Sequence, residues 1–181
     1  MWDDGGAYLF DADWYGVYMT ADRSWNLDTA YNATFDQRYE TCAYQTDNGH
    51  YVKALFKLMQ LRALPLTYNL NDQLWHQEIL PDSGKKLILN NTSAVAALEL
   101  VKQAEDHIVA AAPNNHTKDI AALQFAIRQY KLMITTRRLI AGMVKDYTAA
   151  AVLMPADPQQ ATAKILACAD TLQALNGRYQ A

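Results

Sequence analysis

The sequence contains few of the residues that bind metal ions or form disulfide bonds. Among 181 residues it has two cysteines, Cys42 and Cys168, and four histidines. No CxxC motif occurs and no two histidines stand at metal-ligand spacing, so we predict no metal site and no cofactor. Both cysteines lie in apolar stretches, which predicts two buried free thiols; a single disulfide between them is the alternative.

Long apolar runs and clusters of positive charge are also missing. The net charge is −3 and the 16 basic residues are spread along the chain, so we predict no nucleic-acid surface. No apolar run reaches the roughly 20 residues of a membrane span, which predicts no membrane span. The first residues have neither a basic nor an apolar segment, so they predict no signal peptide. The length suits one domain, and 51% hydrophobic residues suffice for a core.

The sequence does contain apolar residues at helical spacing, and it therefore predicts an all-α helical bundle with a long central helix. The spacing is clearest over 92–112, 117–153 and 158–175, where short connections favour antiparallel helices. Asp157 and Pro158 form a helix-start signal, and Asn176-Gly177 predicts the end of the last helix. The residues expected to face inward are Val95, Leu98, Val101 and Ile108; then Ile120, Leu123, Phe125, Ile127, Tyr130, Leu132, Ile134, Leu139, Ala141 and Val144; then Ile165, Leu166, Ala169 and Leu172.

Shorter helices are predicted over 14–24, 29–45 and 50–63, followed by a long ordered connection over 65–91. We expect the first helix to dock Trp14, Tyr18 and Trp25 on the bundle, with Val17 and Ala21 on the same face. The inward residues expected in the next two helices are Phe35, Tyr39, Cys42 and Ala43, then Val52, Leu55, Phe56, Met59 and Leu61. In the central helix, Arg137-Arg138 predicts one arginine in solvent and one paired with an acid.

The N-terminal segment has the most suggestive chemistry. Trp2, Asp3 and Asp4 precede two glycines in a stretch rich in aromatic and acidic residues. A tryptophan beside carboxylates can bind a sugar, because the indole packs on the C–H face while a carboxylate accepts hydroxyl hydrogens. The glycines let the backbone come close to such a ligand. A frayed, solvated terminus is the alternative.

Trp2-Asp3-Asp4, followed after a helical stretch by Asp22-Arg23-Ser24-Trp25-Asn26, resembles the end of the catalytic barrel in family 20 glycoside hydrolases, the β-N-acetylhexosaminidases. Those barrels end with Trp-x-Glu or Trp-x-Asp on the eighth strand and close with a helix that ends in a Glu/Asp-Arg-x-Trp-like segment. The resemblance implies that 1–28 is the remnant of the last βα unit. It also implies that 29–181 is a helical bundle domain, similar to the all-α extension of some bacterial members.

Carried over, the resemblance implies that Trp2 helps to wall the sugar pocket and that Asp4 accepts hydrogen bonds from sugar hydroxyls, with Asp3 as the lesser partner. The segment 21–25 would be structural. The family's adjacent Asp-Glu catalytic pair has no counterpart here, so no catalytic residue is assigned. We therefore expect a non-catalytic C-terminal domain of an enzyme, implied to be exported and bacterial, that acts on an N-acetylhexosamine-containing sugar.

The alternative to this reading is a stand-alone helical module for protein interaction or small-ligand binding. A homo-oligomer is the other partner that the sequence leaves open, because exposed apolar surface in the N-terminal segment would favour pairing with another copy of the chain.

Overall fold

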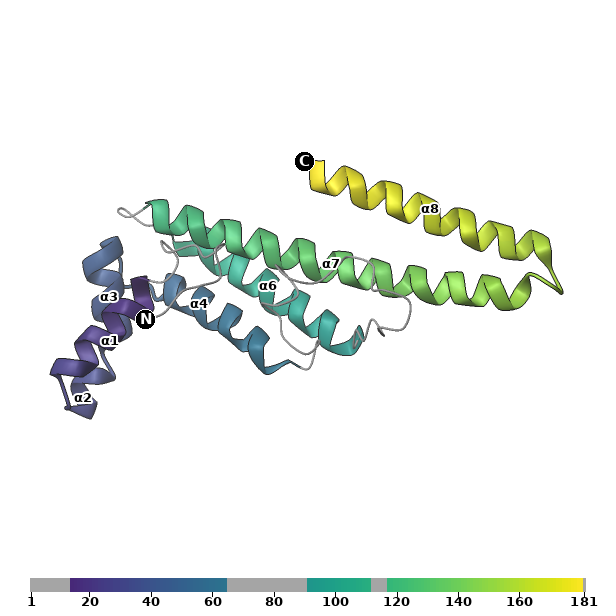
Figure 1. The fold of residues 1–181 in the computed structure, drawn as a ribbon. Coiled ribbons are helices and arrows are strands. Elements are labelled where there is room, and N and C mark those ends of the chain that lie inside the picture. Colours follow the sequence, from purple (N-terminus) through teal and green to yellow (C-terminus); the bar gives the residue numbers. More distant parts are fainter. Residues whose placement is uncertain (1–13, 65–90, 112–116, 181) are drawn as a thin grey trace. The chain divides into compact units, whose positions relative to one another are not determined.

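The computed structural model describes residues 14–64, 91–111 and 117–180, and every regular element in these ranges is helical. The elements are α1 (Trp14–Trp25), α2 (Thr29–Asn32), α3 (Phe35–Tyr44), α4 (His50–Gln60), the 3-10 helix η2 (Leu61–Ala63), α6 (Asn91–Ala111), α7 (Thr117–Leu153) and α8 (Pro158–Gln180) (Figure 1). The all-α prediction is confirmed, and α7, with 37 residues, is the long helix. The connection predicted at 65–91 lies, up to residue 90, outside the described residues.

The described residues fall into two compact units. The first contains α1 to α4, η2, residues 96–111 of α6 and residues 117–131 of α7. The second contains residues 91–95, residues 132–153 of α7, and α8.

In the first unit, α1 lies close to its predicted position but buries a different face. Its buried residue is Tyr15, whose ring makes edge contacts with Phe35, Tyr39 and Phe56 at centroid distances of 5.5, 5.2 and 5.9 Å. The expected docking of Trp25 is wrong, because its side chain is 91% exposed, and Tyr18 is 54% exposed. The three rings from α3 and α4 surround Tyr15, so the face of α1 that carries Tyr15 is buried instead of the face predicted from the sequence.

The helix predicted over 29–45 is broken at residues 33 and 34, where Thr34 donates backbone and side-chain hydrogen bonds to the Tyr31 carbonyl. Helix α3 then buries Phe35, Tyr39, Glu40 and Tyr44. Cys42 is exposed, so the prediction of a buried thiol is wrong there, whereas it is confirmed for Cys168. Both cysteines are free. Two kinds of contact determine which face of α3 is buried: the aromatic contacts of its rings, and the hydrogen bonds that Glu40 accepts from the start of α4.

The N-terminus of α4 is capped by the buried carboxylate of Glu40. The backbone N–H groups of Gly49 and Val52 donate to its two oxygens. Gly49 has a φ of +72°, a left-handed conformation that favours glycine. The buried residues of α4 are Tyr51, Val52 and Ala54. The inward placement of Met59 is wrong, because it is 59% exposed, and Phe56 is buried only in part, with 38% of its surface exposed while its ring contacts Tyr15.

Small residues dominate the buried face of α6 in the first unit. Ala97, Val101, Ala104, Ile108 and Ala111 follow one another at steps of three and four. Small side chains let a neighbouring helix come close. The inward placement of Ile120, Leu123 and Ile127 in α7 is confirmed, whereas Phe125 in α7 and Val95 in α6 are exposed, contrary to expectation.

In the second unit, α8 runs antiparallel to the C-terminal part of α7 (Figure 1). Lys164 Nζ lies 3.3 Å from Asp146 Oδ1, and the Cys168 thiol donates to the Met143 carbonyl. The later residue of α8 thus contacts the earlier residue of α7, as expected for antiparallel helices. The predicted start of α8 is confirmed, because Asp157 Oδ1 accepts the Gln160 N–H at 3.0 Å.

The buried residues of α8 differ from those expected. Over residues 158–177 they are Ala161, Cys168 and Leu175, at a spacing of seven. The inward placement of Ile165, Leu166, Ala169 and Leu172 is wrong, as is the inward placement of Val144 in α7, because all five are exposed. The predicted end at Asn176-Gly177 is also wrong, because the helix continues to Gln180. Glycine is tolerated within a helix at a cost of about 1 kcal/mol. Arg137 is buried and Arg138 exposed, which matches the exposure expected of that pair.

Candidate functional site

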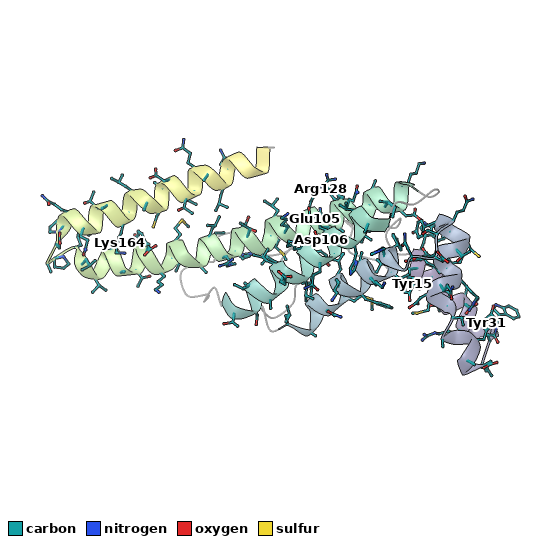
Figure 2. The ribbon with its side chains drawn as sticks, turned by 180° about the vertical axis from the view of Figure 1, so that it is seen from behind. Tyr15, Tyr31, Glu105, Asp106, Arg128 and Lys164 are labelled. Carbon is teal, nitrogen blue, oxygen red and sulfur yellow. The ribbon has the colours of Figure 1, made fainter. Side chains whose placement is uncertain are left out.

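A cleft of about 740 Å³ opens in the first unit between α1, α2 and α3. The segment that ends α1 lies along it, and Asp119 of α7 also contributes. Its lining consists of Trp14, Tyr18, Ala21, Asp22, Trp25, Asn26, Tyr31, Phe35, Arg38, Tyr39, Cys42, Ala43 and Asp119. Figure 2 shows Tyr15 where these short helices meet α4, and Tyr31 at the opposite end of the group.

Arg38 ties the three short helices together. Its guanidinium donates two parallel hydrogen bonds to Asp22, from Nη1 to Oδ1 at 3.1 Å and from Nη2 to Oδ2 at 2.9 Å. Its Cζ lies 3.7 Å from the centroid of the Tyr31 ring, a cation–π contact. It also donates to the Tyr31 hydroxyl at 2.8 Å and to Thr34 Oγ1 at 3.1 Å. A planar, bidentate donor is what this geometry requires, and lysine would not replace it.

The Asp22–Arg38 pair places fixed charges on one wall of the cleft. The hydrogen bonds from Arg38, followed by the charges of Arg38 and Arg23, hold the pKa of Asp22 below its usual value. The hydrogen bond to Asp22 in turn raises the pKa of Arg38. Both groups are therefore ionised at neutral pH. The pair is partly open to solvent, which screens its contribution to stability.

Aromatic rings form the rest of the walls, and several are unusually accessible. Trp25 is 91% exposed, and Tyr18 and Tyr31 are also exposed. Trp14 and Tyr18 lie side by side with ring centroids 5.8 Å apart. Leaving such rings in water forgoes the free energy of burying them, so an exposed aromatic group beside polar residues marks a contact surface.

Hydrogen-bonded phenols lie at the inner side of the cleft. Tyr44 donates to Asp119 Oδ2 at 3.4 Å, and the hydroxyls of Tyr39 and Tyr44 are 3.4 Å apart. Burial raises the pKa of both tyrosines above the ordinary value. They stay protonated at neutral pH, so they donate hydrogen bonds and do not act as bases. Tyr39 and Asp119 line the cleft directly.

The residues predicted from sequence have different outcomes. Trp2, Asp3 and Asp4 lie outside the described residues. The segment 21–25 ends helix α1, and Asp22 and Trp25 from it line the cleft. Tyr31 and Arg38 were not anticipated, because in one continuous helix they would stand two turns, roughly 10 Å, apart. The break at residues 33 and 34 folds Tyr31 back over Arg38.

The described residues hold no group of three or more histidine, cysteine or acidic side chains placed to bind a metal ion. None of the helices in the described part of the chain is both long and apolar enough to cross a membrane. Comparison of the chain with protein-family models, with curated proteins and with solved structures gave no match.

Proposed function

We propose that this chain is a non-catalytic helical domain of a β-N-acetylhexosaminidase-like glycoside hydrolase, and that the cleft beside α1 contacts sugar. The resemblance of Trp2-Asp3-Asp4 and Asp22–Asn26 to the end of the family 20 barrel supports the first part. The second part rests on one observation: an exposed Trp25 beside an ionised carboxylate in a cleft of about 740 Å³. The resemblance alone implies only a structural role for Trp25.

The chemistry of the cleft suits a pyranose. The exposed indole of Trp25 offers a flat apolar surface for the C–H face of the ring. Each Asp22 oxygen accepts one hydrogen bond from Arg38 and keeps a further lone pair for a sugar hydroxyl. The volume of about 740 Å³ lies within the range of about 300–1,000 Å³ that is usual for small-ligand sites.

A protein-interaction module is the second candidate, and Leu27 favours it. Leu27 is 91% exposed, two residues beyond Trp25. An aliphatic side chain next to an exposed tryptophan offers buried area to a protein partner but no stacking face to a sugar. The two functions therefore make different demands on Leu27 and Trp25.

Titration of the chain with oligomers of N-acetylglucosamine, followed by tryptophan fluorescence and calorimetry, tests the sugar contact. We expect saturable binding that Trp25→Ala weakens about two- to tenfold, since aromatic stacking contributes about 0.5–1.5 kcal/mol. Leu27→Ala should bind like the wild type. Tyr147→Ala is the matched control, because Tyr147 is an exposed aromatic residue (60%) of α7 that does not line the cleft.

Two results would contradict the sugar contact. One is the absence of binding at millimolar oligomer. The other is an equal loss of affinity in the Trp25 and Tyr147 variants. Binding of a protein partner that requires both Trp25 and Leu27, without sugar binding, would support the second candidate.

Hydrolysis of aryl β-N-acetylglucosaminides tests the non-catalytic part. We expect no turnover by this chain alone, because it has no counterpart of the family's Asp-Glu pair and loss of a general acid alone costs about 10²–10⁴ in rate. Turnover above a buffer blank that survives repurification would show that the chain is an enzyme.

A further inference from the structure

A pair of histidines joins α4 to α6 in the first unit, and neither residue lines the cleft. His50 is the first residue of α4, and His107 lies one turn before the end of α6. Their Nδ1 atoms are 3.0 Å apart and the ring centroids 5.2 Å apart. That centroid distance is close to the largest that such a nitrogen contact allows, so the rings meet nearly end to end. This is the geometry of an N–H···N hydrogen bond, in which one Nδ1 donates and the other accepts.

Other hydrogen bonds fix the start of α4 beside the end of α6. The backbone N–H of His50 donates to Asn48 Oδ1, and Asn48 Nδ2 donates to the Ala111 carbonyl at the end of α6, each at 3.0 Å. Glu40 of α3 caps the same end of α4. The start of α4 is therefore tied to α3 and to α6. Among these ties, the histidine pair is the one whose side chains ordinarily change charge between about pH 5 and 8.

We propose that His50 and His107 form a pH-sensitive latch between α4 and α6. With both rings neutral, one carries its hydrogen on Nδ1 and donates to the other. With one extra proton, the imidazolium donates and the bond becomes charge-assisted. With two extra protons, both Nδ1 atoms carry hydrogen, no acceptor lone pair remains, and two like charges face each other. The latch therefore holds through the first protonation and opens with the second.

The charges around the pair oppose the second proton. Burial lowers the pKa of His107 first, and the positive charges of His50, Lys53 and Lys57 lower it further. Asp106 acts in the other direction, but its carboxylate is paired with Lys102. From α3, the Glu40 carboxylate is occupied by the N–H groups of α4. The described charges nearest His107 are thus mainly positive.

The sign of the pH effect follows from the lowered pKa of His107. Below the ordinary imidazole value of 6.5, the unfolded chain binds more protons at this position than the folded chain. The stability that the latch contributes is therefore fully present above that pH, and it is lost as the pH falls through the lowered pKa of His107, where the second proton binds. Opening removes one of the contacts that hold the first turn of α4, so that this turn opens more often. In that turn the Lys53 N–H donates to the Gly49 carbonyl at 3.1 Å.

Amide hydrogen exchange of the full chain, measured by NMR between about pH 8 and 5, tests the latch. We expect the protection factor of the Lys53 amide to fall roughly fivefold in the wild type, because losing a hydrogen bond that contributes about 1 kcal/mol changes an equilibrium by that factor. In His107→Asn the side-chain amide occupies the place of Nδ1, but it does not titrate, so protection at Lys53 should not change. The Met154 amide, bonded to the Ala150 carbonyl in the second unit, is the internal control and should not change in either protein.

A second measurement requires only the wild type. Ring ¹⁵N spectra should show a through-bond coupling between the two Nδ1 atoms at about pH 8 that disappears at about pH 5. An equal fall in Lys53 protection in the wild type and in His107→Asn would overturn the proposal. The absence of the coupling at the higher pH would also overturn it. Because the coupling is measured in the wild type, this test holds even if His107→Asn does not fold.

Discussion

Glu40 has no exposed surface, yet its carboxylate is satisfied because the N-terminus of α4 supplies two N–H donors. The first N–H groups of any helix lack partners within the helix, and the helix dipole favours a negative charge there. A side chain of the preceding helix α3 thus caps α4 in place of a residue at the start of α4 itself. Arg38 plays a comparable part for α1 and α2, where one side chain joins two other helices.

Glu40→Gln is expected to lower the free energy of unfolding by about 1–3 kcal/mol, because glutamine offers one acceptor oxygen and places an amide NH₂ against the second donor. Urea denaturation measures the loss. Glu99→Gln is the matched control, since Glu99 is exposed and accepts a hydrogen bond from the Gln103 side chain one turn away in α6. The change in its free energy of unfolding should stay within about 0.5 kcal/mol. Equal effects in both variants would mean that Glu40 does not cap α4.

At the scale of whole helices, α7 shows what periodicity predicts and what it leaves open. Its length and the inward placement of Leu123 and Ile127 match the expectation. Phe125, which the same pattern placed on a second inward stripe, is 43% exposed. A helix with apolar residues on several sides has more than one candidate face, and its neighbours decide which face is buried.

Leu123→Ala is expected to lower the free energy of unfolding by about 2–4 kcal/mol, because it leaves a cavity around a side chain that is 1% exposed. Phe125→Ala removes a larger side chain from a partly exposed site of the same helix and should cost less, about 1 kcal/mol. Thermal and urea unfolding of both variants check the order. A larger loss for Phe125→Ala would show that α7 presents a different face to its unit.

At the scale of the molecule, the first unit is built around buried tyrosines. Tyr15, Tyr39, Tyr44 and Tyr51 contact one another in a chain of rings with centroids 4.3–6.2 Å apart. Burial is the largest cause that raises the pKa of Tyr15, Tyr44 and Tyr51 well above the ordinary value of a tyrosine. A group whose pKa is raised in the folded state contributes stability that is fully present below its pKa in the unfolded chain. That stability is lost as the pH rises through the pKa of the folded state.

We therefore expect cooperative alkaline unfolding to begin above about pH 10, with the last tyrosinate absorbance appearing together with the loss of helical circular dichroism. Tyr51→Phe should unfold at higher pH than the wild type, because it removes one late ionisation. It should lose little stability at neutral pH, since the Tyr51 hydroxyl has no well-formed hydrogen bond to the described residues. Tyr147→Phe, at an exposed site, should leave the unfolding pH unchanged. Tyrosinate absorbance that is complete before any helix is lost would contradict this.

The sequence by itself determined that the chain is helical, where its long helices lie, and how α8 starts, because these depend on contacts within a few residues. The resemblance in sequence also drew attention to Asp22 and Trp25, to which it gave only a structural role, and both line the cleft. The tertiary structure alone decided that Tyr15 is the docked residue of α1, that the chain breaks before Phe35, and that Arg38 stacks on Tyr31. Spacing fixes the period of a helix but not its rotation about its own axis. That rotation, and with it the residues that meet in a site, is set by side chains from distant parts of the chain.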